Sequence, residues 1–529
     1  MTRFFFIFIY SILCISVGFS ETHDKNKELS SLLESYITDL TQVDYTLQEK
    51  LTQRIKKNIS DDPDALDYYA GNKNYILKIC FIRAITKLGN PDYYEKLIPY
   101  LNDPETGVVI EAIHALASSH NDIYAEHLRT KCKNSLDDES VLCTALLALG
   151  EFSNPDIIDF IYAQYISTSS HTIKHHALLA LGKSGVPRAA DYLITIYPTA
   201  YKEYKIFIIM LLGRFRNHPG AITTLDQILK TATEKKWIIP ALSSLGKLES
   251  DKHFDTLLKY LDTQDAALFR TAVKAVGDTG KPEAIYALFK ALSEHPSTEN
   301  QTHIYSTIET ICALYSLEEI KANIIDLDHP SHIITQLALL GDPSSITILK
   351  ELLYHEDPLN RIFAIDALVR IASPERAKKL LLQRLLKATP LDVRIMLPIF
   401  KRWQSESFLS IAELQTVEKS ASKKEPIVIC RAALQDQSAL KDLRTIIQTP
   451  YSAFQWCGIY ALAGSRTDNE MLTILKQTLL KGSLINRYYT AKTVSSMAVH
   501  DSSLKQFIRQ CFETEKNALV IGELQKGVR

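Results

Sequence analysis

Histidine and cysteine are the residues of this sequence best suited to chemistry, and neither type forms a familiar site. His171, His175 and His176 make a short run in which His171 and His175 lie one helical turn apart. That spacing suits two ligands of a metal ion, but a site also needs a third ligand, and none is evident nearby. We therefore expect the solvent-exposed start of a helix here, and no bound metal.

The cysteines are scattered. Cys14 lies in an apolar N-terminal run, and no C-x-x-C motif links the other seven, which excludes zinc-ribbon and thioredoxin-type sites: Cys80, Cys132, Cys143, Cys312, Cys430, Cys457 and Cys511. Most of them lie on apolar helical faces, where a buried thiol behaves as a small hydrophobic group. Cys132 and Cys143 are close in sequence across an expected helical hairpin. Whether they form a disulfide in an oxidising compartment is left open by the sequence.

The common catalytic and cofactor-binding motifs are absent. The sequence contains no G-x-x-x-x-G-K-[ST], G-x-G-x-x-G, G-x-S-x-G or H-E-x-x-H. We therefore expect a protein that is not an enzyme, with no catalytic residue, no cofactor and no evident small-molecule substrate.

The overall charge is nearly balanced. Lysine and arginine number 60 against 61 aspartate and glutamate, a formal net charge of −1. Such a chain has no global field that would steer it towards nucleic acid or a membrane, so electrostatic partners must be sought in local patches. No nucleic-acid partner is expected.

The N-terminus has the parts of a secretory signal. Arg3 precedes an apolar run over residues 4–17, followed by Gly18-Phe19-Ser20 and polar residues. We expect a signal peptide over residues 1–20 and export to the periplasm or the medium. One alternative is an uncleaved anchor helix, which is the single expected route to a membrane, although the apolar run is shorter than the roughly 20 residues that span one. The other alternative is lipidation at Cys14.

Composition points to helices as the elements that position these residues. The chain has 529 residues, 46% of them hydrophobic and 23% charged. Glycine contributes 18 residues, about half the usual share. Helices need few glycines except at their C-terminal ends.

A repeat of about 31 residues organises the chain. The phrase Ala-x-x-x-Leu-Gly, or a near variant, recurs at Gly89, Gly150, Gly182, Gly213, Gly246 and Gly277. Eight intervals cover the 252 residues from Gly89 to Gly341, and a copy without glycine follows at residues 364–368. Each unit contains a first amphipathic helix (A), a polar turn, and a second, alanine-containing helix (B) that is expected to end at the glycine in a left-handed cap.

One helix pair cannot bury its apolar face alone, so stacked pairs are expected to form an all-α solenoid. At these residues the chain resembles HEAT-like repeat proteins, in particular the short-repeat class first named from phycobilisome lyases. The clearest copies are residues 262–277, with Asp265 and Arg270, and residues 341–371, with Asp357 and Arg361. The resemblance implies a ladder between neighbouring repeats, formed by turn aspartates and B-helix arginines, and says little about function.

Four segments are expected along the chain: the signal peptide at 1–20, an N-terminal helical cap at 21–72, HEAT-like repeats at 73–372, and divergent helical repeats with a C-terminal cap at 373–529. In the last segment the pattern favours helices at 440–447, 454–463, 471–480, 488–497 and 504–512.

Some HEAT-like proteins are enzymes. Iron-dependent hydroxylases of this architecture carry His-Glu pairs before the Ala-x-x-Leu-Gly phrase, whereas this chain has one such pair, His355-Glu356, in an inter-helix turn. Bilin lyases use the same repeats, but export argues against that role. The resemblance and the missing motifs favour an exported interaction scaffold or adaptor. A HEAT-repeat enzyme or enzyme-associated subunit, bilin-lyase-like or metal-dependent, is the alternative.

Basic residues concentrate on the expected B helices, which line the concave face in this architecture, while the A helices carry more acids. We hypothesise that the B face receives an acidic segment of a partner protein, with these residues as candidates: Lys174, Lys205, Lys235, Lys236, Arg270 and Lys274. In the alternative, these residues form the intramolecular ladder or solvate helix edges. A tyrosine group around Pro198 is a second candidate, for which core packing is the favoured interpretation: Tyr192, Tyr197, Tyr201 and Tyr204.

Overall fold

A computed structural model describes residues 45–528, with gaps at 136–137, 217, 249–252, 296, 324–333, 335–344, 450–451, 464–468 and 499–500. The expected signal peptide, Cys14 and Gly341 lie outside the described residues. Within the described residues, no helix combines the length and apolarity needed to cross a membrane.

The chain forms two compact units, residues 1–180 and 181–529, which divide within helix α10 (His171–Ser184). All regular elements in the described part of both units are helical, and no strand occurs there. The segment boundaries expected at residues 72 and 372 stay predictions.

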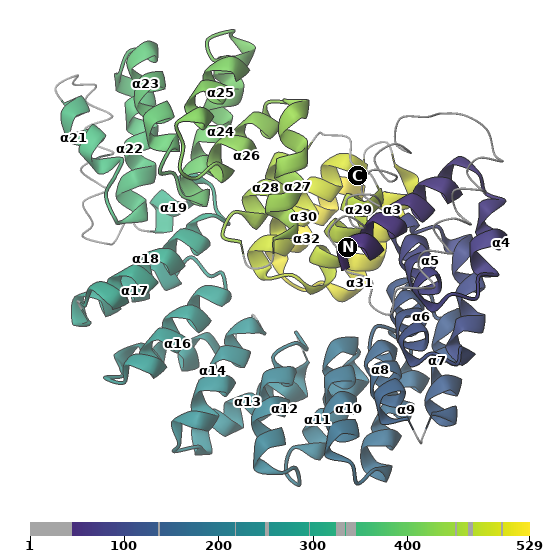
Figure 1. Ribbon diagram of the computed structural model, residues 1–529. Coiled ribbons are helices and arrows are strands. Elements are labelled where there is room, and N and C mark those ends of the chain that lie inside the picture. The colour runs from purple at the N-terminus through teal and green to yellow at the C-terminus, as the bar shows by residue number, and fades with distance from the viewer. Residues whose placement is uncertain are drawn as a thin grey trace, which may run out of the picture. The chain divides into compact units, whose positions relative to one another are not determined.

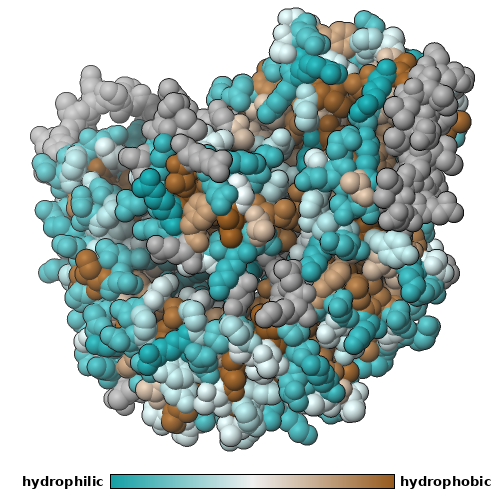
Figure 2. Space-filling view, turned by 180° about the vertical axis from the view of Figure 1, so that it is seen from behind, coloured by the Kyte–Doolittle hydropathy of each residue, from teal (hydrophilic) through white to brown (hydrophobic). Residues whose placement is uncertain are grey.

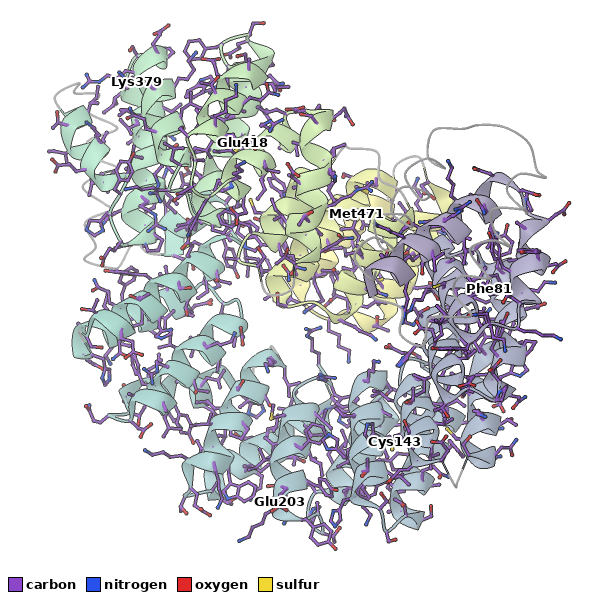
Figure 3. All side chains as sticks on the ribbon, in the orientation of Figure 1. Phe81, Cys143, Glu203, Lys379, Glu418 and Met471 are labelled. Carbon is purple, nitrogen blue, oxygen red and sulfur yellow. The ribbon has the colours of Figure 1, made fainter. Side chains whose placement is uncertain are left out.

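The first unit begins with α3 (Tyr45–Asp61) and α4 (Ala65–Ala70) (Figure 1). Its B helices are α5 (Tyr75–Leu88), α6 (Thr106–Ser118), α8 (Glu139–Leu149) and the first part of α10. Its A helices are η1 (Pro91–Asn102), α7 (Ile123–Asn134) and α9 (Pro155–Ser167). Helix α5 packs on α6 and α6 on α8, and Figure 3 labels Phe81 and Cys143 among these helices.

The second unit continues the alternation. Its A helices are α11 (Pro187–Ile196), α13 (Pro219–Thr231), α15 (Phe254–Leu258) with η3 (Lys259–Asp262), α17 (Ala284–Glu294), α19 (Leu317–Asn323), α21 (Ile346–Leu352), α23 (Pro374–Leu385), α25 (Ile411–Lys419), η5 (Gln437–Ala439) with α27 (Leu440–Gln448), α29 (Asn469–Lys481) and α31 (Ser502–Thr514). Its B helices are α12 (Lys202–Leu212), α14 (Lys235–Lys247), α16 (Ala266–Asp278), α18 (Thr298–Cys312), α22 (Pro358–Ile371), α24 (Pro390–Ser405), α26 (Glu425–Ala433), α28 (Gln455–Ala461), α30 (Leu484–Met497) and α32 (Ala518–Val528).

Every B helix from α12 to α30 packs on the next B helix in this series. The five helices expected after residue 440 are α27 to α31, within a few residues of the expected bounds. The expected all-α solenoid of stacked helix pairs is therefore confirmed.

The recurring glycines act differently from our expectation. Gly89 has the expected left-handed conformation, with φ of +64° at the end of α5. Gly150 and Gly213 end their helices with φ of −67° and −64°, and Gly182, Gly246 and Gly277 lie inside helices. The left-handed cap is thus wrong for the repeat as a whole.

These glycines instead allow B helices to approach one another closely. A Cβ atom on Gly150, Gly213 or Gly246 would lie 2.6 Å from Ala180 O, 2.7 Å from Ser244 Cβ and 2.6 Å from Ala275 Cα, respectively. Gly182 meets Leu211 and Gly277 meets Thr307 in the same way. Each glycine therefore contacts a residue of the next B helix. That residue lies two positions before the repeat-glycine position of its own helix. We call these contacts the glycine seam.

Helix starts in the repeats are fixed locally. Asn154 and Asp357 precede a proline at the first helical position, and their side chains accept hydrogen bonds from the backbone NH groups of Asp156 and Leu359. Asp265 caps α16 in the same way through the NH groups of Ala267 and Leu268. Capping side chains in the short polar turns therefore set where these three helices, α9, α16 and α22, begin.

The second unit also contains contacts between pairs far apart in sequence. Tyr489 of α30 donates a hydrogen bond from its hydroxyl to Ala313 O at 2.6 Å, and Arg394 of α24 donates to Tyr315 O at 2.6 Å. Arg216, after α12, donates to Gly482 O at 2.6 Å, just before α30. Helices α24 and α30 thus reach back to the end of α18. We call these three hydrogen bonds the fold-back contacts.

Candidate partner-binding face of the B helices

The six candidate cations divide into three pairs, and the first pair covers tyrosine rings. The ammonium of Lys174 lies 5.5 Å from the ring centroid of Tyr165, and that of Lys205 lies 5.6 Å from that of Tyr197. Both lysines stand eight residues before a seam glycine, and both rings belong to the end of the preceding A helix or the turn that follows. These contacts are cation–π interactions within a helix pair.

The second pair forms the inter-repeat ladder. Lys235 of α14 pairs with Asp265, which caps α16, and Arg270 of α16 pairs with Glu299 in the first turn of α18. Equivalent rungs elsewhere join Arg83 to Glu111 at 3.0 Å and Arg487 to Glu515 at 2.9 Å. The partners in these four rungs are 28–30 residues apart, one repeat. A ladder between neighbouring repeats is present, but these four rungs differ from the aspartate–arginine pairs that the resemblance implied: glutamate replaces aspartate in three rungs, and lysine replaces arginine in the fourth.

The third pair lies on an exposed face. Lys236 and Lys274 stand ten and three residues before their seam glycines, which places them two helical turns apart on the same side of a B helix. Their side chains are 45% and 69% exposed and pair locally with Glu234 and Asp278. Met210, also three residues before its glycine, is 54% exposed. We call Met210, Lys236 and Lys274 the exposed B face.

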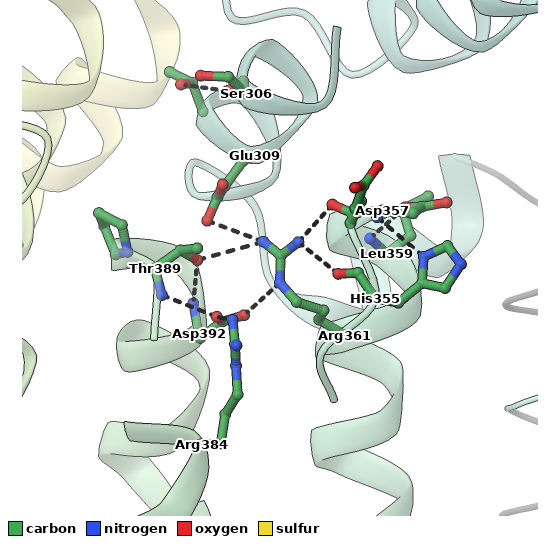
Figure 4. Close-up of polar contacts among 12 residues, drawn as sticks. Ser306, Glu309, His355, Asp357, Leu359, Arg361, Arg384, Thr389 and Asp392 are labelled. Carbon is green, nitrogen blue, oxygen red and sulfur yellow. Dashed lines mark hydrogen bonds and ion pairs between the residues drawn. The ribbon is translucent and has the colours of Figure 1, made fainter. Parts of the chain in front are cut away.

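One rung is a buried charge network at the contact of α18, α22 and α24 (Figure 4). Arg361 pairs with Asp392 at 3.2 Å and with Glu309 at 3.3 Å, and it donates to the carbonyls of His355 and Glu356. Arg384 also pairs with Asp392. Arg361 is thus committed to the interior and cannot serve an exposed basic face.

Glu309 replaces the seam glycine in this copy. It lies two residues after Thr307, which faces Gly277, so it occupies the glycine position of α18. Burial raises the pKa of Glu309, an effect that Arg361 opposes. The contact from α18 to α22 is therefore ionic where earlier B helices meet through glycine.

The tyrosine group is mostly engaged inside its own unit. Tyr204 is buried, Tyr197 lies under Lys205, and Tyr192 stacks with Arg188 at 6.0 Å. Tyr201 is 60% exposed. Core and edge packing therefore accounts for three of the four rings.

The histidine and cysteine groups show no arrangement for chemistry. The rings of His175 and His176 meet edge to face at 5.8 Å, and in the described part of the chain no three His, Cys, Asp or Glu side chains are placed to hold a metal. All seven described cysteines are free and buried, Cys132 and Cys143 included. Burial raises the pKa of Cys80 to about 11 and that of Cys132 to about 12.

A further polar group on the B helices was missed from the sequence. Lys492 of α30 lies over two tyrosine rings, 5.5 Å from the centroid of Tyr460 on α28 and 5.8 Å from that of Tyr488. The Tyr488 hydroxyl and Lys526 both bind Glu523 of α32. We call Lys492, Tyr460 and Tyr488 the tyrosine–lysine cluster. The i,i+4 spacing of Tyr488 and Lys492 was a visible signal, but Tyr460 is close only because α28 packs on α30.

The surface around these groups is mixed. Figure 2 shows hydrophilic side chains interspersed with smaller hydrophobic groups over the visible face. Exposed large apolar side chains are scattered over both units, including Ile123, Ile166 and Tyr286. Single exposed apolar residues of this kind are normal on a soluble surface.

Sequence comparison agrees with the stacked helix pairs. A family model described as HEAT repeats matches residues 133–205 and 326–397. These two segments, which together make up less than half of the chain, are similar to HEAT repeats. No curated protein matches the sequence.

Several solved structures are similar at low scores. The CpcE–CpcF complex of phycocyanin lyase from a Nostoc species is 16% identical, with a TM-score of 0.28 over 41% of this chain and 94% of that one. A Kap95:Nup1 complex is 12% identical, with a TM-score of 0.38 over 96% and 71%. Importin beta is 11% identical, with a TM-score of 0.35 over 90% and 85%. Scores this low carry no information on what this chain binds.

Proposed function

We propose that this chain is an exported, non-enzymatic scaffold that binds an acidic segment of a partner protein on its HEAT-repeat B helices. The observation that carries the proposal is the exposed B face, where Met210, Lys236 and Lys274 share one side of successive helices. The N-terminal signal pattern supports export, and the buried, high-pKa thiols argue against a cysteine nucleophile.

The chemistry of this face suits a peptide. The ammonium groups of Lys236 and Lys274 are exposed, and ion pairs at the surface contribute only about 0–1 kcal/mol, so a partner carboxylate can replace Glu234 and Asp278 at little cost. Methionine is unbranched and adapts to irregular apolar surfaces. Charge complementarity then sets register and orientation.

The structure also shows which residues a test should avoid. Lys235 is one of the six candidate cations, but it pairs with Asp265, the N-terminal cap of α16. A glutamate at position 235 would repel that cap and weaken the helix start. A loss of binding in that variant would have two explanations.

The test is capture of partners from the native exported compartment with the variant Lys236→Glu/Lys274→Glu. The matched control is Lys290→Glu/Lys379→Glu, which makes the same charge change on A helices α17 and α23, with Lys290 in a comparable local pair with Glu294. We expect the first variant to lose partners that the wild type and the control retain. Equal capture by all three proteins would refute the proposal.

A further inference from the structure

The ammonium of the tyrosine–lysine cluster lies over two aromatic rings. Lys492 is half-buried, and among the described residues no carboxylate lies within 4.0 Å of its ammonium. Its contacts are the faces of the Tyr460 and Tyr488 rings. A half-buried ammonium that lies over aromatic faces and has Glu523 only as a more distant counter-charge is less well compensated than a lysine in a direct ion pair of the inter-repeat ladder.

The nearby acids are already bound to other groups. Glu523 accepts hydrogen bonds from Tyr488 Oη at 3.3 Å and from Lys526 Nζ at 2.8 Å. Glu319 accepts from the backbone NH of Ser316 at 2.7 Å. Neither is positioned to pair with Lys492.

Arg394 adds positive charge beside the cluster. Its guanidinium donates to Cys312 O at 3.3 Å and Tyr315 O at 2.6 Å, so its partners in the described structure are neutral carbonyls. Burial is the main cause of a lowered pKa at Lys492; the charge of Glu523 opposes this effect, and the charges of Arg394 and Lys526 lower the pKa further. The site therefore gains from any added anion.

We infer that Lys492, Tyr460 and Tyr488 bind a side-chain carboxylate of an acidic segment in the partner protein, an inference that rests on the proposed function. The ammonium supplies a charge-assisted hydrogen bond, and the rings pack against the methylene groups of a glutamate. A phosphate group fits less well, because the guanidinium of Arg394, which would supply bidentate contacts, is committed to the end of α18.

The test measures binding of a fluorescein-labelled hexaglutamate peptide to the full chain by fluorescence anisotropy. We expect Lys492→Gln to weaken binding by about tenfold or more, since a charge-assisted hydrogen bond is lost. Lys492→Arg keeps the charge and should stay within about threefold of the wild type. The matched control is Lys476→Gln, because Lys476 also lies over one ring, Phe507, at 5.2 Å in the same unit.

Three results would overturn the inference: unchanged binding in Lys492→Gln, an equal loss in Lys476→Gln, or displacement of the peptide by inorganic phosphate at lower concentrations than free glutamate. Thermal unfolding of each variant checks that the fold is intact. The two proposals fail separately. Unchanged peptide binding in Lys492→Gln refutes the cluster, whereas partner capture that ignores Lys236 and Lys274 refutes the exposed B face.

Discussion

At the scale of single residues, each seam glycine is required by its contact with a residue about thirty positions further along the chain. Gly246 has no positive φ, yet a methyl group there would meet the backbone of Ala275. Gly522, inside α32, has no atom within 4 Å of the same position. Substitution by alanine is therefore expected to change the stability of the protein in opposite directions at these two glycines.

We predict that Gly246→Ala lowers the free energy of unfolding by about 1–3 kcal/mol, because overpacking forces α14 and α16 apart. Gly522→Ala should raise it by up to about 1 kcal/mol, because alanine favours a helix interior over glycine. Urea unfolding followed by far-UV circular dichroism measures both. A Gly246→Ala protein as stable as the wild type would mean that the seam is looser than described.

At the scale of elements, the ladder joins each helix pair to the next. One of its rungs is Arg487–Glu515, in which the arginine side chain is 1% exposed. Burial alone would raise the pKa of Glu515, but the charge and hydrogen bonds of Arg487, with two backbone NH groups, outweigh burial and lower it. This rung therefore stabilises the protein only while Glu515 is ionised.

We predict that Glu515→Gln destabilises the protein by about 3 kcal/mol at neutral pH, since it leaves Arg487 buried beside a neutral group. A depressed carboxyl pKa contributes stability that is complete above the unfolded value of 4.5 and is lost as the pH falls through the lower folded value. The difference between variant and wild type should therefore shrink below about pH 4.5. Thermal unfolding between pH 7 and pH 3 measures this difference.

The control for this rung is Glu294→Gln, which breaks the exposed pair of Glu294 with Lys290. Such a pair contributes at most about 0.5 kcal/mol. A constant difference between Glu515→Gln and the wild type across the acid range would show that Glu515 does not titrate as described.

The elements were largely predictable from the sequence, and their contacts were not. Apolar spacing located helices even in the divergent part, such as α30 and α31, because amphipathic periodicity is a local property. The capping role of Asp265 is local as well. The resemblance implied a ladder, but the residues that form each rung, the ionic contact of Glu309 and the approach of Tyr460 to Lys492 join different helices and required the path of the chain.

At the scale of the whole molecule, the second unit departs from a one-dimensional array. In a simple solenoid each repeat contacts only its neighbours. Here two of the fold-back contacts tie α24 and α30 to the end of α18, and Tyr489, which is buried, supplies one of these two. Distant repeats in this unit should therefore lose their order together.

We predict that removing residues 484–529, which deletes α30 to α32, speeds amide hydrogen exchange at the end of α18, because the Tyr489 bond to Ala313 is lost. Hydrogen exchange with mass spectrometry measures this protection. Removing only residues 518–529 deletes α32, which packs on α30 and α31, and should leave α18 protected. Unchanged exchange at α18 in the longer deletion would show that the unit behaves as a simple array.

The glycine seam also has a consequence for how such an array can lengthen. Each copy from α10 to α16 carries both halves of the joint: a glycine for the following helix, and a residue two positions earlier that fills the glycine of the preceding one. A duplicated copy inserted there brings its own joint and needs no compensating substitution. At α18 the glycine position holds Glu309, which pairs with Arg361 of α22, and α18 itself contains no lysine or arginine. A duplicate of this copy would bring a second glutamate without a matching cation, so growth by duplication is expected before α18 and not at it.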